Sequence, residues 1–179
     1  MANKRIIVMV GPSGSGKTSI GEVLSQNGVP RLITTTTRNP RVGEVDGVDY
    51  YFREFSELEI DDFVEQTIYN GNRYGLTKEE VQNQLESFDT VHVSLDQSGA
   101  EAVLKAFPDE ACIIFVSITE EEMIRRMEKR GDSVEAIQER IRFSRETNEL
   151  TPPDFVDLML INDDIKKSAH NILDYIKNK

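Results

Sequence analysis

One stretch near the N-terminus constrains the fold of this chain more than any other. Residues 11–18 read GPSGSGKT and fit the phosphate-binding pattern G-x-x-x-x-G-K-[ST] at every fixed position. A short apolar, β-branched run at 5–10 precedes the pattern and is typical of a buried parallel strand. Apolar residues recur at helical spacing over 20–24, and Asn27-Gly28 ends that helix. The pattern therefore lies between a strand and a helix, which is the context that it needs to hold a phosphate.

The residue types of this loop explain why it binds anions. Its glycines let consecutive backbone N–H groups turn inward at a helix N-terminus, where the helix dipole adds partial positive charge. Lys17 adds a mobile ammonium group for the outer phosphates, and the hydroxyl of Thr18 is a ligand for Mg²⁺. A glycine-rich turn without a ligand is the alternative, and the strand, helix, Lys and Thr in register disfavour it. The expected phosphate-binding residues are Gly11, Ser13, Gly14, Ser15, Gly16, Lys17, Thr18 and Ser19.

Length and charge narrow the class of protein. A chain of 179 residues predicts one domain, or one core that carries small inserted subdomains. The formal charge of −11 disfavours nucleic acid and membranes as partners, because phosphate backbones and anionic lipids attract basic faces. Arginines that converge on one cleft of such an acidic chain are therefore expected to be functional.

The remaining composition predicts an intracellular, soluble and cytoplasmic protein. Cys112 is the single cysteine, so the chain has no disulfide framework, and its place in an apolar run predicts a buried, inert thiol. His92 and His170 have no second His or Cys at ligand spacing and are interpreted as a strand residue and a surface-helix residue. The apolar run at 5–10 is too short for a signal peptide core or a membrane span.

Strands alternate with helices along most of the chain, which favours a parallel sheet covered on both faces. Between residues 34 and 87 the pattern changes to a small α+β insertion, with a hairpin over 64–76 and a helix opened by Thr77. A capping pattern at 56–59 also predicts a short helix as far as Phe63. The other expected strands are 5–10, 31–33, 90–95, 112–118 and 156–161, and the other expected helices cover 98–107, a helix opened by Thr119, 134–150 and 165–176.

Two arginines after the second expected strand form a candidate anion site. Arg38 and Arg41 flank a proline, and Tyr50 follows shortly downstream. Two planar guanidinium groups and a phenol can converge on a phosphate. A surface salt-bridge cluster is the alternative, and this segment alone leaves both open.

A second group of arginines lies on two helices around Gly131. Arginines on both arms of a helical hairpin can close over a transferring phosphoryl group and neutralise its charge. The alternative is a solvated face paired with neighbouring glutamates, and we favour that alternative for Arg125, Arg142 and Arg145.

The chain resembles the guanylate kinases along its whole length. The stretch TTRNPRVGE at 36–44, in register with the phosphate loop, is far more specific than the loop alone. The other positions that carry the likeness are Asp49-Tyr50, Glu65, Gly71-Asn72-Arg73-Tyr74-Gly75, Arg126, Arg130-Gly131 and Ile161-Asn162-Asp163-Asp164.

The resemblance implies an α/β fold with a P-loop NTPase core at 1–33, 88–125 and 146–179, a nucleoside-monophosphate-binding insertion at 34–87 and a helical lid at 126–145. It implies an enzyme that uses ATP and Mg²⁺ to phosphorylate GMP or dGMP. Lys17 and the lid residues Arg126 and Arg140 would act on the donor phosphates, Thr18 would hold Mg²⁺, and Asn162 would contact the donor adenine. The implied acceptor-binding residues are Thr34, Arg38, Arg41, Tyr50, Glu65, Tyr74 and Asp96.

Two further hypotheses stay open on the sequence. Leu76 stands where the family usually has Ser or Thr, and Ser94 stands where it usually has a carboxylate. A kinase of the same fold with another phosphorylated acceptor is therefore the first alternative. The second is a protein-binding module without catalysis, which the presence of Lys17, Thr18 and the lid arginines disfavours. The sequence leaves open whether the protein is a monomer or a homodimer.

Overall fold

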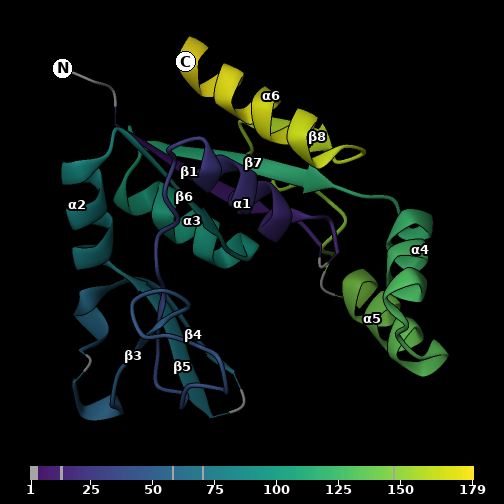
Figure 1. The fold of residues 1–179 in the computed structure, drawn as a ribbon, viewed down its shortest axis with the longest axis horizontal. Coiled ribbons are helices and arrows are strands. Elements are labelled where there is room, and N and C mark those ends of the chain that lie inside the picture. Colours follow the sequence, from purple (N-terminus) through teal and green to yellow (C-terminus); the bar gives the residue numbers. More distant parts are fainter. Residues whose placement is uncertain (1–3, 13, 58, 70, 147) are drawn as a thin grey trace.

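The computed structural model describes residues 4–12, 14–57, 59–69, 71–146 and 148–179. Its centre is a four-stranded sheet in the order β6-β1-β7-β8, in which every neighbouring pair is parallel (Figure 1). The strands are β1 (Arg5–Val10), β6 (Thr90–Ser94), β7 (Ala111–Ser117) and β8 (Leu158–Ile161). The prediction of an α/β fold with a parallel sheet flanked by helices is confirmed.

Helices cover both faces of this sheet because its strands are apolar on both sides. Ile7 and Met9 of β1 pack in one core cluster with residues of α1 (Lys17–Gln26) and α6 (Ile165–Asn178). Ile6 and Val8 face the other way and pack with residues of α3 (Gln97–Ala106). This alternation follows from the two-residue period of a strand.

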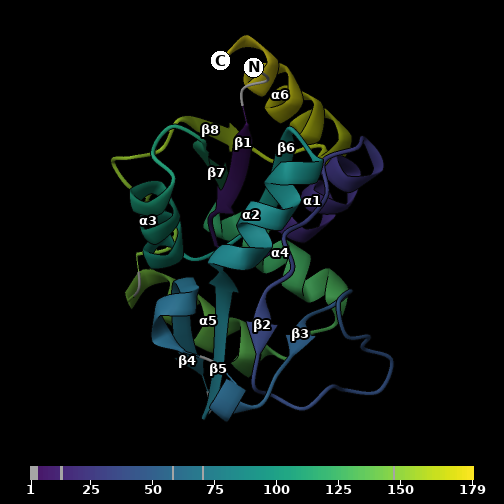
Figure 2. The same cartoon turned by 90° about the vertical axis from the view of Figure 1, so that its left-hand side faces the viewer.

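A second, smaller sheet lies beside the core within residues 35–77, as Figure 2 shows. Its order is β3-β2-β5-β4, with strands β2 (Thr35–Thr36), β3 (Tyr51–Phe52), β4 (Phe63–Tyr69) and β5 (Asn72–Thr77). The antiparallel pair β4–β5 confirms the expected hairpin. Helix α2 (Lys78–Ser87) follows, and the Thr77 side chain accepts a hydrogen bond from the Glu80 N–H, which confirms the expected cap.

A pair of helices projects from the end of β7 (Figure 1). Helix α4 (Glu120–Arg130) begins at the N-cap Thr119 and ends at Gly131, which has a φ of 88°. Helix α5 (Val134–Glu146) packs against it through a small cluster that contains Met123, Met127 and Ile137. The pair has its own apolar contacts, apart from the two clusters of the main sheet.

Three expectations about local structure are wrong. Residues 31–33 form no strand, since Arg31 makes one isolated bridge to His92 before the chain enters the small sheet. The helix expected at 56–63 is replaced by the short 3₁₀ turns Phe55–Glu57 and Ile60–Asp62, and Phe63 already belongs to β4, where its side chain is buried. The helix expected as far as Leu150 ends at Glu146, and Asn148 adopts a left-handed φ of 56°.

The cysteine and both histidines have the structural roles expected of them. Cys112 is buried in β7, and burial raises the pKa of its thiol to about 11. His92 is buried in β6 with its Nε2 3.0 Å from Ser25 Oγ, and burial lowers its pKa to about 4. His170 lies exposed on α6. No helix in the described part of the chain is long and apolar enough to cross a membrane.

Candidate active site

The phosphate loop joins β1 to α1 and has a backbone that only glycine accommodates at two positions. Gly11 has a φ of 138°, and a Cβ there would overlap the carbonyl oxygen of Val116 in β7. Gly16 has a φ of 97°, and a Cβ there would overlap the side-chain amide of Asn162. The expected phosphate-binding residue Ser13 lies outside the described residues. The glycines are thus required by close approach to the ends of β7 and β8 as well as by the turn.

Lys17 is folded back onto its own loop. Its Nζ donates hydrogen bonds to the carbonyl oxygens of Gly11, at 2.6 Å, and Pro12, at 2.9 Å. Burial lowers the pKa of its ammonium group to about 8, against a smaller opposing effect of Glu149. Carbonyl oxygens are weaker partners for an ammonium group than phosphate oxygens, so an incoming phosphate can displace them.

Arg126 connects α4 to the loop. Its Nη1 donates to the carbonyl oxygen of Gly14 at 3.0 Å, its Nη2 donates to that of Asn162 at 2.7 Å, and its Nε pairs with Glu122 at 2.8 Å. A cavity of about 1070 Å³ opens beside these groups. The cations that line it are Lys17, Arg125, Arg126, Lys129, Arg130 and Lys166, together with Thr18 and Ser19 from the start of α1. Glu122, Asp163 and Asp164 also line it, so cations outnumber anions in a cavity that has the volume for a polyphosphate ligand.

Arg140 lies on α5, the second helix of the projecting pair. Its guanidinium pairs with Glu149, and that carboxylate also accepts a hydrogen bond from Ser144 Oγ at 3.2 Å. Arg140 and Glu149 both influence the pKa of Lys17, so their charges lie within electrostatic reach of the loop. Arg125, Arg142 and Arg145 instead pair with Glu122, Glu146 and Glu120 and are largely exposed, which confirms the surface interpretation of those three.

The expected acceptor arginine Arg38 has a fixed orientation. Its two Nη atoms each lie 2.9 Å from a carboxylate oxygen of Glu44, which also accepts the backbone N–H of Arg41 at 2.7 Å. The guanidinium carbon lies 5.5 Å from the centre of the Tyr50 ring, and the rings of Tyr50 and Tyr74 are 6.1 Å apart. The structure therefore brings Arg38, Tyr50 and Tyr74 together, whereas the side chain of Arg41 is exposed.

Glu65 and Asp96 converge at the junction of the two sheets. Glu65 Oε1 accepts the backbone N–H of Leu76 across the hairpin at 3.0 Å. A Cβ on Gly99 would lie 3.3 Å from Asp96 Oδ1 and 3.4 Å from Glu65 Oε2, so both carboxylates border that glycine. Burial, with a smaller contribution from Asp96, raises the pKa of Glu65 to about 7. Glu65 is half-buried and Asp96 is exposed, with one Asp96 oxygen accepting the Gly99 N–H, so the free oxygens of the two carboxylates fit a ligand that donates two hydrogen bonds.

The two groups of residues meet in one cavity of about 480 Å³. Lys17 and Thr18 line it from the phosphate loop and α1, and Thr34 and Tyr50 line it from the side of the small sheet. Ser94, at the end of β6, lies between them. Of the residues expected on the acceptor side, Thr34 and Tyr50 line this cavity, whereas Arg38, Arg41, Tyr74, Glu65 and Asp96 do not.

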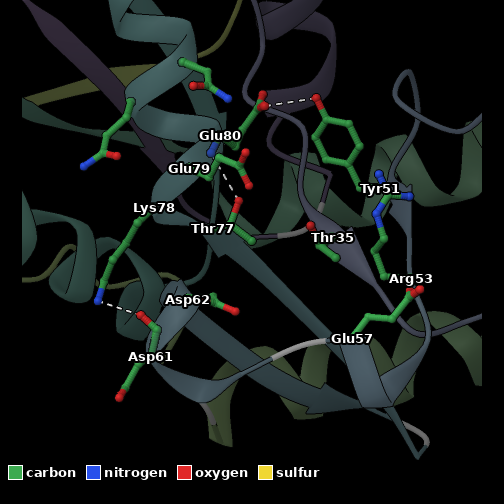
Figure 3. A pocket seen from close by; sticks show the side chains of 12 residues that line it. Thr35, Tyr51, Arg53, Glu57, Asp61, Asp62, Thr77, Lys78, Glu79 and Glu80 are labelled. Atoms are coloured by element: carbon green, nitrogen blue, oxygen red, sulfur yellow. Dashed lines mark hydrogen bonds between the residues drawn. The ribbon is translucent and has the colours of Figure 1, made fainter.

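A separate pocket of about 580 Å³ opens among Thr35, Tyr51, Asp61 and Lys78 and is shown in Figure 3. None of the expected site residues lines it. Thr35 and Tyr51 directly follow Thr34 and Tyr50, and neighbouring residues of an extended segment point to opposite sides. Its buried carboxylate, Glu80, accepts hydrogen bonds from the Ile33 N–H and the Tyr51 hydroxyl at 2.9 and 3.0 Å. Glu80 therefore ties α2 to the segment that enters the small sheet.

Sequence reasoning did not identify the partners of the site residues. Glu44 was quoted within the TTRNPRVGE stretch, and its proximity to two arginines was the signal for its role as their carboxylate partner. Glu149 and Ser168 carry no sequence signal, since no motif or helical spacing links Glu149 to Arg140, nine residues away, or Ser168 to Asn162, six residues away. The described part of the chain contains no group of three or more His, Cys, Asp or Glu residues suited to hold a metal ion.

Known proteins match this chain over nearly its whole length. The family model for guanylate kinase matches residues 3–179. The guanylate kinase of Fusobacterium nucleatum is 34% identical to this chain, and the match covers 97% of this chain and 96% of the relative. The guanylate kinase of Trichormus variabilis is 36% identical, and the match covers 94% of this chain and 87% of the relative. The crystal structure of guanylate kinase from Anaplasma phagocytophilum shares the fold with a TM-score of 0.69 at 22% identity, covering 99% of this chain and 87% of its own. The sequence and structural matches agree with the geometry of the site, and the chain belongs to the guanylate kinase family.

Proposed function

We propose that this protein transfers the γ-phosphoryl group of ATP to the phosphate of GMP or dGMP. The observation that carries the proposal is the cavity that Lys17 and Thr18 share with Thr34 and Tyr50. In the reaction, the bond between the γ-phosphorus and the β,γ-bridging oxygen breaks, a bond from that phosphorus to an acceptor phosphate oxygen forms, and ADP leaves. Direct transfer needs both phosphates in one water-poor space, which this cavity supplies once closed.

The donor side acts by position and charge. The N–H groups of the loop and Lys17 bind the phosphates of ATP, and Arg126 and Arg140 neutralise charge that develops during transfer. The exposed hydroxyl of Thr18 opens onto the same cavities as Lys17, so it fits a site for Mg²⁺, whose remaining ligands would be phosphate oxygens and water. Mg²⁺ held at Thr18 would supply positive charge that reduces the repulsion between the donor phosphates and the incoming acceptor.

The acceptor side acts by recognition. Arg38, Arg41, Tyr50 and Tyr74 bind the monophosphate, with Thr34 close to the nucleoside. Glu65 and Asp96 accept hydrogen bonds from the ring N–H and the amino group of guanine, which adenine does not offer in the same arrangement. The Leu76 side chain is fully buried among the apolar residues of the core, so the Leu76 contribution at this site is its backbone N–H, which orients Glu65.

We expect residues 34–87 and 126–145 to move as the insertion and the lid of the family. Closure of both over the core brings Arg38 and Arg140 toward the transferring group and excludes water. A cytoplasmic location stays a prediction from the single cysteine.

A coupled assay of ADP release tests the proposal. ATP and Mg²⁺ are held constant while GMP, dGMP, IMP, AMP, UMP and ribose phosphates serve in turn as acceptor. We expect GMP and dGMP to give the highest kcat/KM, with AMP and UMP close to background. Equal turnover with AMP and GMP would contradict the role of Glu65, and transfer to a ribose phosphate alone would favour the kinase with another acceptor. The absence of ATP binding would favour the protein-binding module.

A further inference from the structure

Asn162 is buried at the point where the main sheet meets the phosphate loop. It follows β8 directly, and its residue is 4% exposed. Its backbone N–H donates to the carbonyl oxygen of Ser117 at the end of β7, at 3.4 Å. Its own carbonyl oxygen accepts the guanidinium of Arg126 at 2.7 Å. Two main-chain hydrogen bonds therefore hold Asn162 in place independently of its side chain.

The side-chain amide of Asn162 is engaged at both ends. Nδ2 donates to the carbonyl oxygen of Ser15 at 2.7 Å, and Oδ1 accepts the hydroxyl of Ser168 at 3.1 Å. Ser15 and Ser168 are buried as well. Because a carbonyl oxygen only accepts hydrogen bonds, the contact with Ser15 fixes which end of the amide faces the loop.

This contact sets the direction of one peptide group in the loop. In a planar trans peptide the C=O of Ser15 and the N–H of Gly16 point in opposite directions. Since the carbonyl oxygen of Ser15 points at Asn162, the N–H of Gly16 points away from it. The amide also fills the space that a Cβ on residue 16 would need, so the second fixed glycine of the motif is matched to Asn162.

We infer that Asn162 is a positioning residue for the phosphate loop, held by Ser168, and that it acts on the donor phosphates through the Ser15–Gly16 peptide. This inference rests on the proposed function, in which the loop binds ATP. It differs from a contact with the donor adenine, because Oδ1 and one N–H of Nδ2 are bonded to α6 and to the loop.

Inorganic tripolyphosphate separates the two roles, because it has phosphates and no base. The variants are Asn162→Asp, which places an acceptor against the Ser15 carbonyl, and Ser168→Ala, which releases the amide from its holder. His170→Ala, at an exposed position of α6, is the matched control. Calorimetric titration of the full chain gives Kd for tripolyphosphate, ATP and GMP, and circular dichroism checks the fold.

We expect Asn162→Asp to weaken tripolyphosphate and ATP by the same factor, about 10- to 100-fold, which corresponds to one lost buried hydrogen bond. Ser168→Ala should weaken both in parallel by about threefold to tenfold, since it loosens the amide without removing it. The Kd for GMP should stay at the wild-type value in each variant, and His170→Ala should match wild type with all three ligands.

Weaker ATP binding with wild-type tripolyphosphate binding would overturn the inference and assign Asn162 to the adenine. If Asn162→Asp does not fold, Ser168→Ala decides alone, and wild-type tripolyphosphate binding in that variant overturns the inference. The two proposals can also fail separately. If the wild-type protein binds tripolyphosphate but does not phosphorylate GMP, the proposed function is refuted. If the variants then still lose tripolyphosphate binding, the loop-positioning role of Asn162 stands.

Discussion

The donor side and the acceptor side each centre on one partly buried ionisable group, a cation in one and an anion in the other. Lys17 has its pKa lowered to about 8, and Glu65 has its pKa raised to about 7. Burial is the largest cause in both cases, because a low-dielectric surrounding disfavours the charged form whatever its sign. Without ligands, both groups therefore titrate close to neutral pH.

The two groups differ in how they are held. Lys17 has a flexible side chain whose partners are carbonyl oxygens of its own loop, and a phosphate can replace them. Glu65 is fixed by the Leu76 N–H across the hairpin and bordered by Asp96, so it is aimed before a base arrives. The donor side thus depends on the backbone conformation of the phosphate loop and on the mobile charge of Lys17. The acceptor side depends on groups held in place by β4, β5 and the start of α3.

Removal of the mobile charge gives the largest expected effect. Lys17→Ala should lower kcat by about 100- to 1000-fold, the usual loss when one preorganised charged donor is removed from a transition state. The measurement is ADP release with saturating GMP. Lys105→Ala, on the exposed face of α3 and paired with Glu101, is the control and should keep wild-type activity. Activity near wild type in Lys17→Ala would refute the donor assignment.

Removal of the fixed anion should affect the acceptor alone. Glu65→Gln keeps the size of the side chain and removes its charge, so kcat/KM for GMP should fall by about 10- to 100-fold. The Kd for ATP, measured by calorimetry, should not change. Glu57→Gln, at an exposed position of the small insertion, serves as the charge-matched control. A parallel loss of ATP binding would show that Glu65 supports the fold of both sites rather than base recognition.

The raised pKa of Glu65 predicts a pH dependence for GMP binding. Guanine donates two hydrogen bonds and therefore prefers the ionised carboxylate, so the bound pKa lies below the free value of about 7. Binding then releases a proton, and affinity falls as pH drops below about 7, by up to about tenfold per pH unit. Calorimetric Kd values for GMP between about pH 6 and 8 measure this slope.

The phosphate of GMP also titrates, near pH 6 for a phosphate monoester. Glu65→Gln provides the correction, because it retains the titration of the ligand and lacks that of the carboxylate. The difference between the two profiles therefore belongs to Glu65. Identical profiles for the two proteins would contradict a titrating Glu65.

The donor side was largely predictable from the sequence, for a physical reason. The motif at 11–18, the strand before it and the helix after it are contiguous, so local rules of glycine geometry and periodicity fix their arrangement. The same local rules found the hairpin 63–77 and the caps Thr77 and Thr119. They failed at 56–63, where a capping pattern was overridden by the burial of Phe63 in β4.

The environment of the site residues was less predictable. Asn162 meets Ser15 across the tertiary fold, and the turns after α5 and β8 bring Arg140 to Glu149 and Asn162 to Ser168 at spacings that no motif predicts. Leu76, which stands where the family usually has Ser or Thr, is a further example. Its side chain packs in the core, and its backbone N–H donates a hydrogen bond to Glu65. Motifs thus locate the residues that carry chemistry, and packing decides what orients them.

The lowered pKa of Lys17 gives the smallest predicted effect and the opposite sign. Bound polyphosphate stabilises the ammonium form, so the bound pKa lies above the free value of about 8 and binding takes up a proton at higher pH. Affinity for ATP should therefore fall as pH rises above about 8, by about threefold to fivefold per pH unit. The slope is below about tenfold because the loop N–H groups and the arginines still bind the phosphates when Lys17 is neutral. The phosphates of ATP are already ionised there, so the slope reports the protein. Lys17→Arg, which stays charged, should give a flat profile in the same titration. If ATP affinity still falls with pH in Lys17→Arg, a group other than Lys17 titrates. The contrast between a donor side weakened by base and an acceptor side weakened by acid would then no longer rest on Lys17 and Glu65.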